Sequence, residues 1–114
     1  MNNISVGKHG EELARNYLIK NGYKIIDFNV RFSKFCEVDI IALDNKTLVF
    51  CEVKTRTTEI CGNPLEAITK SKYKHIKMGI FYYLQEHSEY KKYRIDAISI
   101  VLKPELRIKH LKNI

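Results

Sequence analysis

Four ionisable side chains lie in two neighbouring apolar segments of this chain. Glu37 and Asp39 belong to the first segment, and Glu52 and Lys54 belong to the second. Residues 44–46, Asp-Asn-Lys, have the composition of a turn, so the two segments predict a β-hairpin. Two carboxylates and a lysine on adjacent strands form a set that can bind a metal ion and act on a water molecule.

The expected strand register places the two acids against each other. A loop of two or four residues pairs Asp39 with Glu52 and Glu37 with Lys54. Because side chains alternate along a strand, Ile41 is expected on the same face as Glu37 and Asp39. Directly opposed side chains have Cβ atoms roughly 4.5–5.5 Å apart. Carboxylates that close repel one another unless a proton or a cation lies between them.

Two interpretations of the hairpin are open from this pattern. In the first, a divalent metal ion is shared by the acids, and Lys54 positions or deprotonates a water molecule for phosphodiester hydrolysis. In the second, the hairpin face is exposed to solvent, and ion pairs Glu37–Lys54 and Glu52–Arg56 offset each other's charge.

Composition and length bound the class of protein. The 114 residues are 45% hydrophobic and 11% aromatic, which predicts one folded domain over residues 1–114. No apolar run approaches the ~20 residues of a membrane span, and the first four residues do not resemble a signal peptide. The three cysteines and four histidines show no disulfide or zinc spacing. We therefore expect a cytoplasmic protein without a membrane partner.

The positive charge is confined to the second half of the chain. Residues 1–66 are neutral, and residues 67–114 carry the whole net charge of +7. Such a one-sided charge fits a polyanionic partner, most commonly nucleic acid. It fits equally well a solvated, lysine-rich surface that keeps the protein soluble.

Hydrophobic periodicity predicts the elements that must position these residues. The expected fold is α/β, with a central mixed sheet flanked by helices and the order αβββαββ. Alternation in the first strand predicts that Ile26, Phe28, Val30 and Phe32 share a buried face. Asn63 and Pro64 form a helix-start signature. The expected elements are a helix over 5–21, a strand over 23–32, the hairpin strands, a helix from 63 to about 87 with irregular structure near residue 70, and strands over 93–102 and 106–111.

Two charged residues outside the hairpin lie beside apolar stripes. At about 100° per residue, Glu12 points into water, whereas Glu11 falls at the edge of the stripe of Leu13 and Leu18, where it can approach a sheet. The alternative role for Glu11 is to complement the helix dipole. Lys72 falls on the apolar stripe of the second helix. Either it snorkels to solvent, or its ammonium reaches an anion at the end of the sheet.

As a set, these segments resemble the PD-(D/E)XK nuclease superfamily, and more closely the YraN-like family of bacterial proteins, which is similar to archaeal Holliday-junction resolvases. The likeness spans nearly the whole chain. Val38 stands where the superfamily name has proline, and Cys36 stands where a small residue is common. The likeness is carried by residues 7–14 (GKHGEELA), 37–42 (EVDIIA), 50–56 (FCEVKTR), 62–67 (GNPLEA), Lys72 and 94–96 (RID).

The resemblance implies a restriction-endonuclease-like fold and roles for individual residues. Asp39 and Glu52 are expected to bind Mg²⁺ or Mn²⁺, Lys54 to be the active-site lysine, and Glu11 to be an accessory catalytic acid. With the basic half of the chain, the resemblance also suggests nucleic-acid contacts. The residues expected to make these contacts are Arg56, Lys70, Lys72 and Lys74.

The expected function is a metal-dependent endonuclease that hydrolyses DNA phosphodiester bonds, with branched DNA as a resolvase-like substrate. A homodimer is a separate expectation, because resolving a junction takes two cuts. The alternative is a nucleic-acid-binding module of the same fold without catalysis. A third interpretation is a protein-interaction domain whose basic surface confers solubility.

Overall fold

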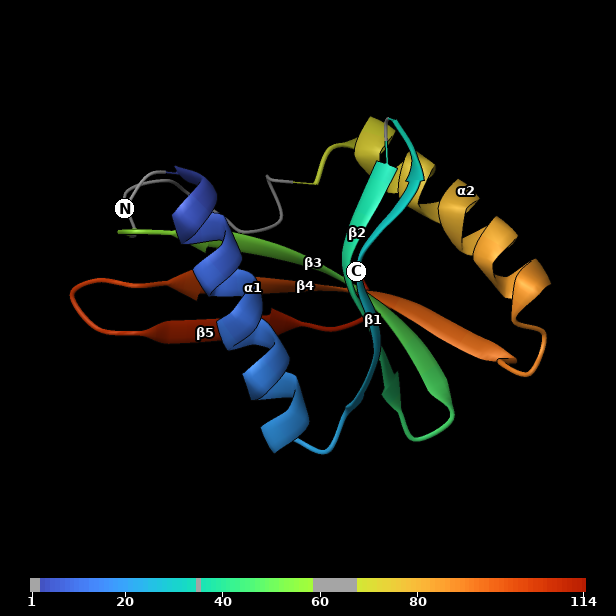
Figure 1. Ribbon diagram of the computed structural model, residues 1–114, viewed down its shortest axis with the longest axis horizontal. Coiled ribbons are helices and arrows are strands. Elements are labelled where there is room, and N and C mark those ends of the chain that lie inside the picture. The colour runs from blue at the N-terminus through green and yellow to red at the C-terminus, as the bar shows by residue number, and fades with distance from the viewer. Residues whose placement is uncertain (1–2, 35, 59–67) are drawn as a thin grey trace.

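The computed structural model describes residues 3–34, 36–58 and 68–114, with side chains from Ser5 onward. Over these residues the expected order αβββαββ is confirmed. Figure 1 shows the helices packed against one sheet. The elements are α1 (Asn3–Lys20), β1 (Lys24–Ser33), β2 (Cys36–Asp44), β3 (Thr47–Arg56), α2 (Lys70–Glu86), β4 (Lys92–Val101) and β5 (Arg107–Leu111).

The five strands form one mixed sheet in the order β1-β2-β3-β4-β5. Neighbours are antiparallel except β3 and β4, which run parallel from Thr47↔Lys92 to Arg56↔Val101. A parallel pair needs a crossover connection, and the segment that contains α2 supplies it. The mixed sheet expected from the sequence is therefore confirmed.

The two helices cover opposite faces of this sheet (Figure 1). On α1, Ala14 and Leu18 are fully buried, as the periodicity predicts. They belong to a core that also contains Ile40, Ala42, Val49, Ile98 and Ile100. On α2, Ile76 and Ile80 are buried in a second core with Val38, Ile41, Leu48, Phe50 and Ile95.

Strand β1 departs from the predicted alternation at Phe28. Ile26, Val30 and Phe32 pack against the core beneath α2, whereas Phe28 is 49% exposed. Its ring instead lies 4.4 Å from the guanidinium carbon of Arg15 on α1. A register shift after Ile25 and a positive φ of 51° at Asn29 interrupt the regular alternation of the strand.

Helix α2 begins at Lys70, where the sequence predicts irregular structure within a longer helical segment. Thr69 is its N-cap, and the Thr69 hydroxyl accepts a hydrogen bond of 3.0 Å from the Lys72 N–H. Ile68 and Thr69 are not helical, which agrees with the irregular structure expected near residue 70. The start signature at 63–66, Cys61 and the motif at 62–67 lie outside the described residues. No helix in the described ranges is long and apolar enough to cross a bilayer.

Candidate active site

The predicted acid pair lies where β2 and β3 separate. Their ladder runs from Asp44↔Thr47 to Ile40↔Cys51, which confirms the register expected from the sequence. One position further, Asp39 Oδ2 accepts a hydrogen bond of 2.7 Å from the Val53 N–H. The Asp39 carboxylate thus accepts, from β3, a hydrogen bond of the kind that a backbone carbonyl of β2 accepts elsewhere in the ladder.

Glu52 is buried, with 9% of its surface exposed. Its Oε1 lies 2.7 Å from Lys72 Nζ, whereas its Oε2 is buried without a hydrogen-bond partner among the described residues. Burial, and next the charge of Asp39, raise the pKa of Glu52 from 4.5 to about 7, although the Lys72 ammonium acts in the opposite direction. Burial also raises the pKa of Asp39, against the lowering effect of the Val53 N–H. The site is short of positive charge even with Lys72 in place.

The two interpretations of the hairpin can now be separated. Glu37 pairs with Arg31 at 3.5 Å, and no ion pair joins it to Lys54 among the described residues. Since Glu52 is buried and pairs with Lys72, the solvent-exposed hairpin face is wrong.

The expected common face of Glu37, Asp39 and Ile41 is also incorrect. Both Val38 and Ile41 pack beneath α2, which strict alternation does not allow. The alternation breaks between them, at Asp39, and the β1–β2 ladder skips the Asn29–Asp39 pair.

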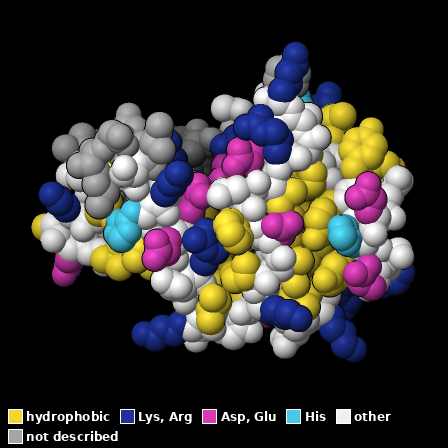
Figure 2. All heavy atoms as spheres, viewed as in Figure 1, with side chains coloured by type: hydrophobic (Ala, Val, Ile, Leu, Met, Phe, Trp, Pro, Cys, Tyr) yellow, Lys and Arg dark blue, Asp and Glu magenta, His cyan; other side chains and the backbone are white. Residues whose placement is uncertain are grey.

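Glu11 approaches this site from α1, as its position on the helix predicts. It is half-buried and lines a groove of about 530 Å³ with the N-terminal part of α1 and the end of β3, whereas Glu12 is exposed. Burial, and next the charges of Asp39 and Glu37, raise the pKa of Glu11. Its position beyond the first turn of α1 argues against a role in complementing the helix dipole. Figure 2 shows acidic side chains gathered on this face between α1 and β2.

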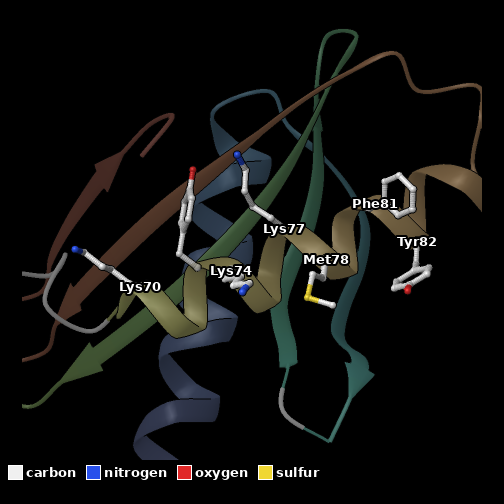
Figure 3. A pocket seen from close by; sticks show the side chains of 7 residues that line it. Lys70, Lys74, Lys77, Met78, Phe81 and Tyr82 are labelled. Carbon is white, nitrogen blue, oxygen red and sulfur yellow. The ribbon is translucent and has the colours of Figure 1, made fainter.

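The predicted basic residues divide between two surfaces. The exposed Lys54 and the half-buried Arg56 line the same groove as Glu11. Lys72 reaches an anion, as one interpretation held, but that anion is the Glu52 carboxylate. Lys70 and Lys74 lie apart from the acid pair, in a second groove on the outer face of α2 (Figure 3).

Gly10 is a positioning residue that the hydrophobic pattern does not identify. A Cβ at this position would collide with the Thr55 side chain, so glycine allows α1 to lie directly on β3. Because Glu11 follows Gly10, this close approach sets the distance of Glu11 from the sheet. Its sequence signal is a glycine within an otherwise helical segment.

The acid pair fits a divalent metal ion in the number and chemistry of its donors. Mg²⁺ commonly takes one or two carboxylates and completes its shell with water and substrate phosphate oxygens. Asp39 and Glu52 supply two carboxylates, which are close enough to share a side-chain hydrogen bond when one of them carries a proton. When both are ionised, the buried Oε2 of Glu52 has no hydrogen-bond donor among the described residues and can bind a metal ion. Within the described ranges, no three Asp, Glu, His or Cys residues converge as a ready-made metal cage.

A second buried polar cluster is centred on the fully buried Asp96 of β4, the strand next to β3. Its carboxylate accepts hydrogen bonds from Arg94 Nε at 3.0 Å, His110 Nε2 at 2.7 Å and the Asn113 N–H at 2.9 Å. Burial alone would raise the pKa of Asp96, but these hydrogen bonds hold it below its usual value. The absence of metal-ligand spacing among the histidines gives no indication of the role of His110 in this network. An aspartate within an apolar strand was its sequence signal.

Comparison with known proteins gives a consistent family. Residues 10–100 match the profile of a group described as "Uncharacterised protein family UPF0102", and this range includes every predicted site residue. The chain is also similar along most of its length to proteins named "UPF0102 protein". One from Rhodococcus opacus (strain B4) is 40% identical, over 97% of this chain and 96% of the relative. One from Natranaerobius thermophilus is 38% identical, over 99% and 98%, and one from Caldicellulosiruptor bescii is 42% identical, over 90% and 87%.

Proposed function

This chain belongs to the uncharacterised protein family UPF0102, and we propose that it is a metal-dependent endonuclease that hydrolyses DNA phosphodiester bonds. The YraN-like resemblance is thereby confirmed at the level of the family. The observation that carries the proposal is the buried pair Asp39 and Glu52, which retains an unpartnered carboxylate oxygen. Leaving a buried polar atom unpaired costs about 1–3 kcal/mol, so such an atom calls for a ligand.

The proposed roles combine the family resemblance with the position of each side chain. Asp39 and Glu52 would hold Mg²⁺ or Mn²⁺, which when bound stabilises charge on the phosphate and lowers the pKa of a bound water. Lys54, on the same strand as Glu52, would orient that water or accept its proton. Glu11 would support the site from α1. Arg56, in the groove with Glu11, would bind a phosphate of the nucleic acid.

Membership of the PD-(D/E)XK superfamily is part of this proposal. The element order, the mixed sheet and the acids at the diverging ends of β2 and β3 support a restriction-endonuclease-like topology. The finer form of the proposal is cleavage of branched DNA by a homodimer, since a junction needs two symmetric cuts.

One observation favours the alternative of a binding module without catalysis. The Lys72 ammonium already neutralises part of the charge of Glu52 at 2.7 Å. If the Lys72 ammonium permanently takes the place of the metal ion, the protein can still bind nucleic acid through its basic surface but cannot hydrolyse it. This alternative predicts salt-sensitive nucleic-acid binding that survives both a chelator and the substitution Asp39→Ala.

The test offers linear, flap and four-way DNA to the protein in the presence of Mg²⁺ or Mn²⁺. Wild type should cut at least one of these substrates, and Asp39→Ala should lower the rate by about 100-fold or more. Glu12→Gln is the matched control, because it removes an exposed carboxylate from the helix that carries Glu11. No cleavage by wild type, or equal cleavage by Asp39→Ala, would overturn the proposal, and binding without cleavage would support the alternative.

A further inference from the structure

The outer face of α2 combines lysines with exposed aromatic and thioether side chains. Its residues line a groove of about 500 Å³, which Figure 3 shows on the side of the helix turned away from the sheet. The opposite side of the same helix holds the buried Ile76, Gly79 and Ile80. The groove is lined by Lys70, Lys74, Lys77, Met78, Phe81 and Tyr82, and at its edge by Tyr73, which packs against the core and donates a hydrogen bond to the Ile114 carbonyl.

The apolar members of this groove are unusually open to solvent. Met78 is 50% exposed, Phe81 is 59% exposed and Tyr82 is 60% exposed. The rings of Phe81 and Tyr82 meet edge to face with centroids 5.7 Å apart. The core therefore does not account for these rings, since the next aromatic residue, Tyr83, is the one that packs inward against Phe50.

The charge of the face selects the kind of occupant. Four lysines lie on α2, and its first acidic residue is Glu86, at the end of the helix. Contact of two such faces from two copies of the chain would bring lysines together, which disfavours self-association here. A polyanion is favoured instead, because phosphates can pair with the lysines while planar groups cover the rings.

The groove and the acid pair lie on different sides of the first turn of α2. Lys70 lines the groove, whereas Lys72, two residues later, holds Glu52, and side chains two residues apart on a helix do not share a face. A nucleic-acid strand that passes from the acid pair around the N-terminal end of α2 would therefore meet first lysine and then aromatic side chains.

We propose that the outer face of α2 binds an unpaired nucleic-acid strand, with Lys70, Lys74 and Lys77 on phosphates and with Phe81 and Tyr82 stacked on bases. The location of the strand rests on the proposed function, but its binding needs neither metal nor cleavage. Bases inside a duplex do not offer their faces for stacking, so the inference specifies single-stranded or flap-bearing nucleic acid.

The test measures fluorescence anisotropy of a labelled oligo-dT of about 15 nucleotides, in chelator, against a duplex of the same length. Replacing both exposed rings, in Phe81→Ala/Tyr82→Ala, should weaken oligo-dT binding at least about fivefold, because stacking contributes roughly 1–3 kcal/mol per base. Duplex binding should change less. Phe28→Ala on β1 is the matched control, since it removes a ring of similar exposure and should leave oligo-dT binding unchanged.

A second pair of substitutions separates charge from stacking. Lys74→Gln/Lys77→Gln should weaken oligo-dT and duplex alike and flatten the dependence of binding on salt. Unchanged oligo-dT binding in the aromatic variant, no oligo-dT binding by wild type at low salt, or a change of oligomeric state in that variant would overturn the inference. Stacking-dependent binding without any DNA cleavage would overturn only the proposed nuclease, and cleavage without such binding would overturn only the role of α2.

Discussion

At the scale of single residues, the Glu52 carboxyl is the least satisfied group of the site. Among the described residues its Oε2 is the buried side-chain atom without a hydrogen-bond partner. An ionised carboxylate is more expensive to bury than a neutral acid, so Glu52 keeps its proton to higher pH in the folded state than in the unfolded state. Without a metal ion, this acid opposes folding once it ionises.

The first prediction concerns metal-free protein in chelator. Unfolded Glu52 ionises near pH 4.5 and folded Glu52 near pH 7, so its unfavourable contribution is absent below pH 4.5 and complete above pH 7. Glu52→Gln keeps an acceptor for Lys72 and has no charge to bury. Its Tm should equal that of wild type near pH 4.5 and exceed it above pH 7 by several degrees, since 1 kcal/mol shifts the Tm of such a domain by roughly 4–8 °C.

The same thermal scans contain their control. Glu12→Gln removes an exposed acid and should give a Tm difference from wild type that does not grow with pH. If the Tm difference between Glu52→Gln and wild type is the same at pH 4.5 and above pH 7, ionisation of Glu52 does not destabilise the folded protein.

The site residues differ in how far the sequence predicts them. Asp39, Glu52 and the direction of Glu11 follow from strand register and helical periodicity, which are local patterns. The Lys72–Glu52 ion pair depends on how α2 packs on the sheet, and periodicity indicates only that Lys72 faces inward. The common face predicted for Glu37, Asp39 and Ile41 is wrong because the strand pairing is irregular beside Asn29. The hydrophobic pattern of the sequence does not indicate this irregularity.

At the scale of elements, the contact between α1 and β3 controls the position of Glu11. Gly10→Ala would place a Cβ against the Thr55 side chain, so α1 must shift from the sheet. We predict a loss of about 1–3 kcal/mol in the free energy of unfolding, measured by urea denaturation.

Gly7→Ala provides the matched control in the same helix. A Cβ at Gly7 meets no atom within 4 Å, so this change should stabilise the helix by up to about 1 kcal/mol. Thr55→Ala should relieve part of the Gly10→Ala defect. Equal stability of the two glycine variants would contradict the close contact.

The start of α2 illustrates why element boundaries are hard to predict. Asn63-Pro64 and Thr69 are both acceptable helix starts, and apolar residues continue the helical period between them. The structure shows a helix start at Thr69, whose hydroxyl caps the Lys72 N–H. Local pattern does not predict the cap at Thr69, because the apolar period runs through it without a break, and the start signature at 63–66 lies outside the described residues.

At the scale of the whole molecule, the Asp96 network joins distant parts of the chain. Arg94 on β4 binds Asp96, the Asp44 carboxylate at 2.9 Å and the Tyr23 hydroxyl at 2.8 Å. His110 on β5 links Asp96 to the Tyr17 hydroxyl of α1 at 3.1 Å. The network therefore fixes α1 and β5 against β4, beside the strand that carries Glu52.

Asp96→Asn should lower the free energy of unfolding by about 3–5 kcal/mol, because it removes the fully buried carboxylate from the Arg94 guanidinium and leaves it only the more exposed Asp44. Asp44→Asn, at a more exposed partner of Arg94, should cost about 1 kcal/mol or less. Chemical denaturation of both variants checks the ranking. Equal losses would show that the network is not centred on Asp96.

The network also has a pH signature opposite in sign to that of Glu52. Because the pKa of folded Asp96 lies below its usual 3.8, its stabilising contribution is present above pH 3.8 and is lost as the pH falls through the lower value. Wild type should lose stability below pH 4 more steeply than Asp96→Asn does.

The fold class follows from the sequence, whereas the arrangement in space does not. The order of helices and strands predicts an α/β protein with a mixed sheet, since both helices have one apolar face. The parallel pairing of β3 with β4 and the placement of the helices on opposite faces come from contacts between residues far apart in the chain. So does the Asp96 network, whose members span positions 17 to 113.

The most direct test of the central claim is a calorimetric titration of Mn²⁺ into metal-free protein above pH 7, where folded Glu52 is ionised. We predict binding of one ion by wild type, loss of most affinity in Glu52→Gln, and several-fold tighter binding in Lys72→Met, because the ammonium competes for Oε1. Lys74→Met, on the outer face of α2, should bind as wild type does. No binding by wild type, or unchanged affinity in Glu52→Gln, would contradict a metal site at this acid pair.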